Sequence, residues 1–163
     1  MPARRQHARR GTGNGSTMNA ATDRHVAIRR HGWAWLALCA TLAVHVADEA
    51  LTDFLSFYNP MVTSLRERLG WWPMPNFTFD VWIRGLIIAV VVLTALSYFV
   101  FRGARAMIPL SCFFGVLMLL NGLGHSLGSL YFARLLPGVY SSPLLLACSV
   151  WLLMATAWRM RHW

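Results

Sequence analysis

The stretch VWIRGLIIAVVVLTALSYFVF, residues 81–101, decides the fold class of this chain. Its single charged side chain, Arg84, stands near the beginning, and the rest of the stretch is apolar or weakly polar. About 20 such residues are enough to cross the hydrocarbon core of a bilayer as an α-helix. We therefore predict that residues 81–101 form a transmembrane helix.

The composition of the whole chain agrees with a membrane protein. Hydrophobic residues make up 56% of its 163 residues, and only six residues are acidic, which is not the profile of a soluble domain. The net charge of +9 comes from arginines that mostly flank apolar runs, so it indicates topology rather than nucleic-acid binding. We expect the lipid bilayer, and no nucleic acid, as the partner of this chain.

Three further apolar runs predict an all-α, polytopic membrane domain over residues 32–158. With the first stretch they give four transmembrane helices, at about residues 32–55, 81–101, 106–131 and 139–158. Between the first two, residues 56–80 repeat apolar side chains at helical spacing and place Arg66, Glu67 and Arg68 on the opposite face. That pattern is typical of a helix that lies in the membrane interface.

The two ends of the chain carry arginines and no long apolar run. We expect residues 1–31 to be a disordered Arg-rich cytoplasmic tail and residues 159–163 a short cytoplasmic tail. His31 falls in the first tail, so we expect it to be solvated or interfacial. Eleven arginines lie on the side of the termini and three on the other side, which predicts a multi-pass protein of the cell (inner) membrane with both termini in the cytoplasm.

Polar side chains stand where lipid would penalise them. In the first span they occur at i, i+3, i+4, i+7 and i+8, which is one face of a helix: His45, Asp48, Glu49, Thr52 and Asp53. The third span contributes Asn121 and His125, four residues apart, and the second begins with Asp80 and Arg84. Three helices therefore each present a polar face.

The polar faces of the first and third spans match in depth. At a rise of about 1.5 Å per residue, His45 and Glu49 lie roughly 22 and 28 Å from the cytoplasmic boundary, and Asn121 and His125 lie roughly 24 and 30 Å from it. An ionised carboxylate in mid-membrane costs on the order of 3 kcal/mol, so Asp48 and Glu49 need compensation from Arg84, a protonated histidine, a proton of their own or a bound cation. A common site in the outer half of the bilayer is the simplest explanation.

The turn before the fourth span adds a covering element. Ser142 and Pro143 read as a helix cap and the first helical residue, which leaves the fourth helix slightly short for the bilayer. We expect the connection before it to dip into the outer leaflet and cover the site.

The motifs at these positions resemble a known family. His45-Val-Ala-Asp48-Glu49, followed by Asn121-Gly-Leu-Gly-His125 and then by Pro137-Gly138, resembles the bacterial integral-membrane family named for its HXXEE motif, which also has a recurrent NxxxH pattern. The resemblance covers about residues 45–142. The chain departs from the motif at Asp48, where the family has Glu and the carboxylate is therefore one methylene shorter. The resemblance implies a membrane-embedded enzyme and supplies no established activity.

These residue types suit a divalent metal. His45, Glu49 and His125 make a two-His, one-carboxylate set for Zn, Fe or Mn. Glu49, Asp48 and Asn121 are the candidate catalytic residues, with Asp53 and Arg84 as supporting groups. Metal-dependent hydrolysis or transfer on a lipid or lipid-linked substrate would follow. A di-iron site would need more carboxylates than one chain provides, and hence a homodimer.

Three other classes of function fit the same residues. A buried Glu beside His supports metal-free acid-base isomerisation of an apolar lipid. Intramembrane Asp, Glu and His also build proton relays, which suits a proton- or cation-coupled carrier. The structural alternative is that these groups only join helices by hydrogen bonds, which we favour for Thr52 and for Asn121 taken alone.

Overall fold

The computed structural model describes residues 12–71 and 73–162. These residues form five α-helices and no strand, which confirms the all-α class. The helices are α1 (Thr12–Leu51), α2 (Phe54–Leu69), α3 (Phe79–Phe101), α4 (Met107–Tyr131) and α5 (Ser142–Arg161).

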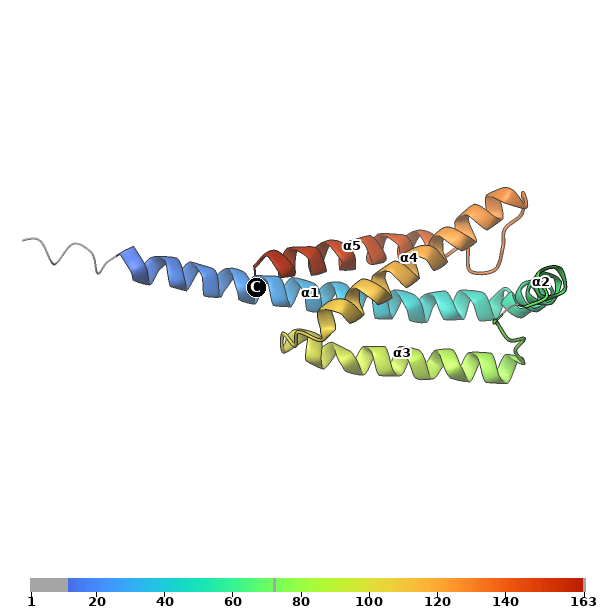
Figure 1. Cartoon of the computed structure of the whole chain (residues 1–163), viewed down its shortest axis with the longest axis horizontal. Helices are drawn as coiled ribbons and strands as arrows, with labels where there is room; N and C mark the ends of the chain where they lie inside the picture. Colours follow the sequence, from blue (N-terminus) through green and yellow to red (C-terminus); the bar gives the residue numbers. More distant parts are fainter. Residues whose placement is uncertain (1–11, 72, 163) are drawn as a thin grey trace, which may run out of the picture.

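Four of these helices are long and apolar enough to cross a membrane. They are the segment Ala21–Leu51 of α1 and the whole of α3, α4 and α5, so the prediction of four spans is confirmed. Figure 1 shows that α1, α3, α4 and α5 run along the long axis, while α2 is drawn nearly end-on at one end of the bundle. That direction is the one expected of an interfacial helix.

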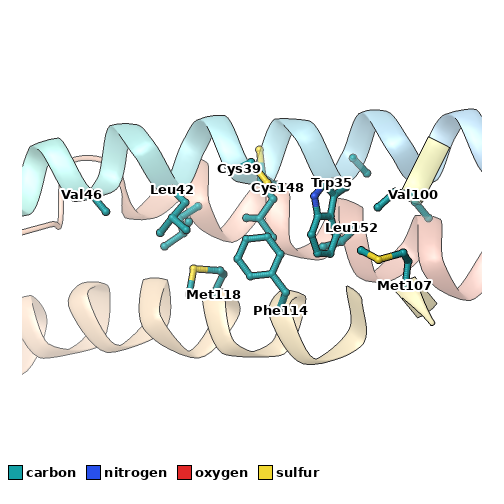
Figure 2. Packing of buried hydrophobic residues seen from close by; sticks show 14 residues of the cluster. Trp35, Cys39, Leu42, Val46, Val100, Met107, Phe114, Met118, Cys148 and Leu152 are labelled. Atoms are coloured by element: carbon teal, nitrogen blue, oxygen red, sulfur yellow. The ribbon is translucent and has the colours of Figure 1, made fainter. Parts of the chain in front are cut away.

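α1 is the central helix of the bundle. It packs against α3 on one side and α5 on the other, and α5 packs in turn against α4. The core between these helices holds side chains from all four of them (Figure 2), including Trp35 of α1, Val100 of α3, Phe114 of α4 and Leu152 of α5. The Trp35 indole donates to the backbone oxygen of Leu93 over 2.9 Å, which joins α1 to α3.

The prediction of a disordered N-terminal tail is wrong over residues 12–31, which are helical. α1 begins at Thr12 and continues without a break into the first span, because adding turns to a helix that the span has already nucleated requires no second nucleation step. Residues 1–11 lie outside the described part of the chain. Ala27 is 1% exposed and packs within the bundle.

His31 and Arg159 are buried, although both were expected outside the spans. His31 donates from Nε2 to Oγ of Ser111 over 2.8 Å, and Arg159 donates from Nη1 to Nδ1 of His31 over 2.8 Å. Arg159 also donates to the backbone oxygen of Ala104. These bonds join α1, α4 and α5, so α5 continues to Arg161 instead of ending at residue 158.

α1 ends four residues earlier than predicted, at Leu51. Asp53 adopts the left-handed conformation, with φ of 56°, which a continuous helix cannot accommodate. The chain turns there into α2. Two hydrogen bonds hold the segment after α2 against that helix. The side chain of Asn59 donates to the backbone oxygen of Phe77 and accepts from the backbone N–H of Phe77.

Candidate metal centre

Two helices bring three potential metal ligands together. His45 and Glu49 are four residues apart on α1 and share one face, and His125 comes from α4. Oε1 of Glu49 lies 3.0 Å from Nε2 of His125 and 3.6 Å from Nε2 of His45. The ligand atoms of these three residues, which we call the buried triad, all lie within 4.8 Å of one another.

The buried triad is shielded from solvent. His45 is 0% exposed, Glu49 6% and His125 9%. The two imidazole rings meet edge to face, with centroids 4.9 Å apart. A carboxylate in such a place is costly without a cationic or hydrogen-bonding partner, and His125 is the nearest donor.

Asn121 reaches the same centre from α4. Its Nδ2 lies 3.1 Å from Nε2 of His45, one helical turn before His125. Asn121 and His125 thus act from one face of α4, as their spacing of four residues predicted.

Ser141 lies between Asp48 and His45. Its hydroxyl oxygen is 2.7 Å from Oδ2 of Asp48 and 2.7 Å from Nδ1 of His45. A serine has one hydrogen to donate, and the bond to a carboxylate is the stronger one. Ser141 therefore donates to Asp48 and accepts from Nδ1–H of His45, which leaves the lone pair of His45 on Nε2, the atom that Asn121 and Glu49 approach.

Asp48 bonds to the turn before α5 and reaches the buried triad only through Ser141. Its Oδ2 accepts from the backbone N–H of Ser141 over 2.9 Å as well as from the hydroxyl. Ser141 is the N-cap residue of α5, where the prediction had placed Ser142. The shorter side chain of Asp48 thus accepts a hydrogen bond from the backbone N–H at the start of α5, and it orients His45 through the Ser141 hydroxyl.

Gly138 lies directly against both imidazoles. A Cβ built there would stand 2.9 Å from Cε1 of His125 and 3.0 Å from Cε1 of His45. The residue also has φ of +82°, which favours glycine. The connection between α4 and α5 therefore covers the buried triad, as predicted, and only a residue without a side chain fits at this point.

Two predicted supporting residues are absent from the centre. Asp53 lies at the bend between α1 and α2, is exposed, and accepts from the hydroxyl of Ser56. Arg84 is also exposed and pairs with Asp80 over 3.8 Å. The prediction of a stripe running to Asp53 was wrong because α1 stops at Leu51, and Arg84 does not compensate the carboxylates of the centre.

An aromatic side chain closes one side of the centre. Phe54 of α2 stacks on Trp82 of α3 with centroids 5.7 Å apart and lies 5.8 Å from the His125 ring. Tyr58 also stacks on Phe54, with centroids 5.4 Å apart, and its hydroxyl donates to the backbone oxygen of Pro75. Burial raises the pKa of Tyr58, which keeps this phenol a neutral donor. Phe54 thus fills the space between α3 and α4.

The roles of Ser141, Gly138 and Phe54 were missed in the sequence. Pro137-Gly138 and the Ser-Ser-Pro that follows signalled a turn, but no periodicity links a turn to a particular face of α1. A positive-φ glycine after a buried helix is a signal of close approach. Phe54 gave no signal, because it is one of three aromatic residues in residues 54–58 and nothing in the sequence tells which of them faces the centre.

The comparison with protein families matches most of the bundle. A family model described as a protein of unknown function with HXXEE motif matches residues 35–152. The match includes the buried triad, Asn121 and the turn with Gly138 and Ser141. No match was found among curated proteins or among solved structures.

Proposed function

The chain belongs to the family of proteins of unknown function with an HXXEE motif, and we propose that it is a membrane-embedded, metal-dependent enzyme that acts on a lipid or lipid-linked substrate. The observation that carries the proposal is the convergence of His45, Glu49 and His125 within 4.8 Å. No other described group of three or more His, Cys, Asp or Glu residues has this geometry.

The distances within the buried triad suit a small divalent ion. Two ligands bound at ~2.1 Å to a tetrahedral metal are roughly 3.4 Å apart. The separations of 3.0 and 3.6 Å from Glu49 to the two histidines lie on either side of that value. Two imidazoles and a carboxylate are ligands that Zn, Fe and Mn accept.

The hydrogen bonds around His45 support the proposal that it is a metal ligand. Its Nδ1–H is held by Ser141, which is held in turn by Asp48. Such outer hydrogen bonds fix the tautomer and the ring direction of metal-binding histidines. The geometry favours this positioning role for Asp48 over the role of a general base.

Three protein ligands leave a coordination position for substrate or water. A metal bound there would polarise an ester or phosphoryl oxygen and lower the pKa of a bound water. Asn121 donates to Nε2 of His45, and a metal that took this lone pair would leave the amide N–H groups free to donate to an anionic oxygen. Gly138 and Phe54 exclude water from two sides.

The orientation of the helices would place this chemistry near the outer surface of the inner membrane. We infer from the excess of arginines near both termini that these face the cytoplasm. The buried triad then lies in the outer half of the bilayer, and a lipid reaches it laterally. A homodimer is compatible with this arrangement and is not needed to complete the buried triad.

One observation supports a metal-free alternative. Oε1 of Glu49 lies 3.0 Å from Nε2 of His125, which is close enough for a proton to pass between a carboxylate and an imidazole. Acid-base isomerisation of an apolar lipid would use this pair directly. The two candidates differ in whether activity depends on an added metal.

Enzyme activity can be tested on the full chain in lipid nanodiscs. Total bacterial lipid is supplied with Zn, Fe(II) or Mn in turn, and products are followed by mass spectrometry. We expect new hydrolysed or transferred lipid products with one metal and none with Glu49→Gln, while the matched variant Glu67→Gln, exposed on α2, stays active. Equal products from both variants, or no product from any lipid with any metal, would overturn the proposal.

A further inference from the structure

A groove lies at the outer surface of the α4–α5 connection, apart from the buried triad. Its walls come from the last turns of α4, from the connection and from Pro143 at the start of α5, and its volume is about 700 Å³. A volume of this size falls in the range of pockets that hold a small ligand. The residues that matter below are Leu130, Leu135, Val139 and Arg134.

The lining of the groove is almost wholly apolar. Leu130 is 78% exposed and Leu135 67% exposed, although both are large aliphatic residues. The two serines in the wall are already engaged: Ser126 donates to the backbone oxygen of Gly122, and Ser129 accepts from the N–H of Leu136. A hydrocarbon chain is the occupant that such a surface favours.

One charged side chain lines the groove. Arg134 is exposed and extends over the rings of Phe57 and Phe132, at 5.7 and 5.8 Å from their centroids. It follows the end of the α4 span by three residues, which is the depth of lipid headgroups. A guanidinium there suits a phosphate, which it can bind through two parallel hydrogen bonds.

We propose that this groove binds a membrane lipid with an anionic, phosphate-bearing headgroup. The hydrocarbon chain occupies the apolar groove and the phosphate pairs with Arg134. The site goes beyond the proposed function and does not depend on it, because none of the metal-ligand candidates lines the groove. The two sites are neighbours, since Val139 lines the groove while Gly138 packs on His45 and His125.

The proposal can be tested by native mass spectrometry of the full chain. The protein is released from nanodiscs that contain equal amounts of phosphatidylglycerol and phosphatidylcholine, and the retained lipids are counted. Arg134→Gln should lower the preference for phosphatidylglycerol by about fivefold, the ratio that corresponds to ~1 kcal/mol for one basic residue near an anionic surface. Leu130→Trp, which fills the groove, should reduce retention of both lipids.

Matched variants separate this groove from general lipid contact. Arg68→Gln removes another exposed arginine, and Leu127→Trp enlarges an exposed leucine of α4 outside the groove. Both should retain lipid like the wild type. Equal losses in the matched variants, no loss in Arg134→Gln and Leu130→Trp, or a second copy of the chain in place of lipid would overturn the proposal. Metal content is measured on the same samples and should not change, so failure of the groove and failure of the metal centre remain distinguishable.

Discussion

The hydroxyl of Ser141 lies 2.7 Å from Nδ1 of His45, so a turn residue sets the direction of a histidine that belongs to the central helix. The same hydroxyl is 2.7 Å from Asp48. These two hydrogen bonds, between Asp48 and Ser141 and between Ser141 and His45, link the first motif of the chain to the start of α5. It explains how a carboxylate one methylene shorter than the family motif still serves the centre.

Ser141→Ala should weaken metal binding without unfolding the protein. The substitution frees Nδ1 of His45, and loss of such an outer hydrogen bond typically lowers metal affinity by about 10- to 100-fold. The measurement is a competition titration with a metal chelator in detergent. Ser142→Ala is the matched control, because that neighbouring buried serine donates to Gly138 and not to His45. Equal metal affinity in the two variants would rule out the positioning of His45 by Ser141.

Gly138→Ala should destabilise the fold and displace the histidines. A left-handed alanine costs roughly 1–2 kcal/mol, and the added Cβ would stand within 3.0 Å of both imidazoles. Gly70→Ala carries the backbone cost alone, since nothing lies within 4 Å of its Cβ and its φ is +69°. Thermal unfolding and metal content should show a larger loss for Gly138→Ala. Identical losses would mean that the turn does not press on the centre.

Arg84→Gln and Asp53→Asn should leave the metal content of the protein unchanged. Both residues are exposed and contact no member of the buried triad. Asn keeps a side chain that tolerates the left-handed conformation of position 53. If either variant bound less metal per chain than the wild type, that residue would have the supporting role that the sequence predicted.

Phe54→Ala should open the centre on the side of α2. The ring fills the space between Trp82 and His125, so its removal should increase the rate at which diethylpyrocarbonate modifies His125 by several-fold, as followed by peptide mass spectrometry. Phe57→Ala removes a neighbouring ring that packs on Phe132 instead and should leave that rate unchanged. A rate that rises equally in both would show that α2 as a whole, and not Phe54, closes the site.

The sequence predicted the spans and most of the centre because both follow from periodicity. Residues 81–101 need only hydropathy, and His45, Glu49, Asn121 and His125 need only a spacing of four on two helices of matched depth. The prediction that Asp53 belongs to the centre was wrong because Asp53 itself adopts a left-handed conformation just after the end of α1. Hydropathy does not report such a break. Burial of His31 with Arg159 depends on the packing of three helices, which no local pattern contains.

The central claim is that His45, Glu49 and His125 hold a divalent metal, and elemental analysis by mass spectrometry tests it most directly. The full chain is purified in detergent without chelators and through a tag that lacks histidine. The His45→Ala, His125→Ala double variant is compared with a His25→Ala, His162→Ala control, in which two exposed histidines are removed. We predict about one Zn, Fe or Mn per chain in the wild type and the control, and none in the double variant of the centre. The absence of metal from all three proteins, or equal metal in all three, would contradict the assignment.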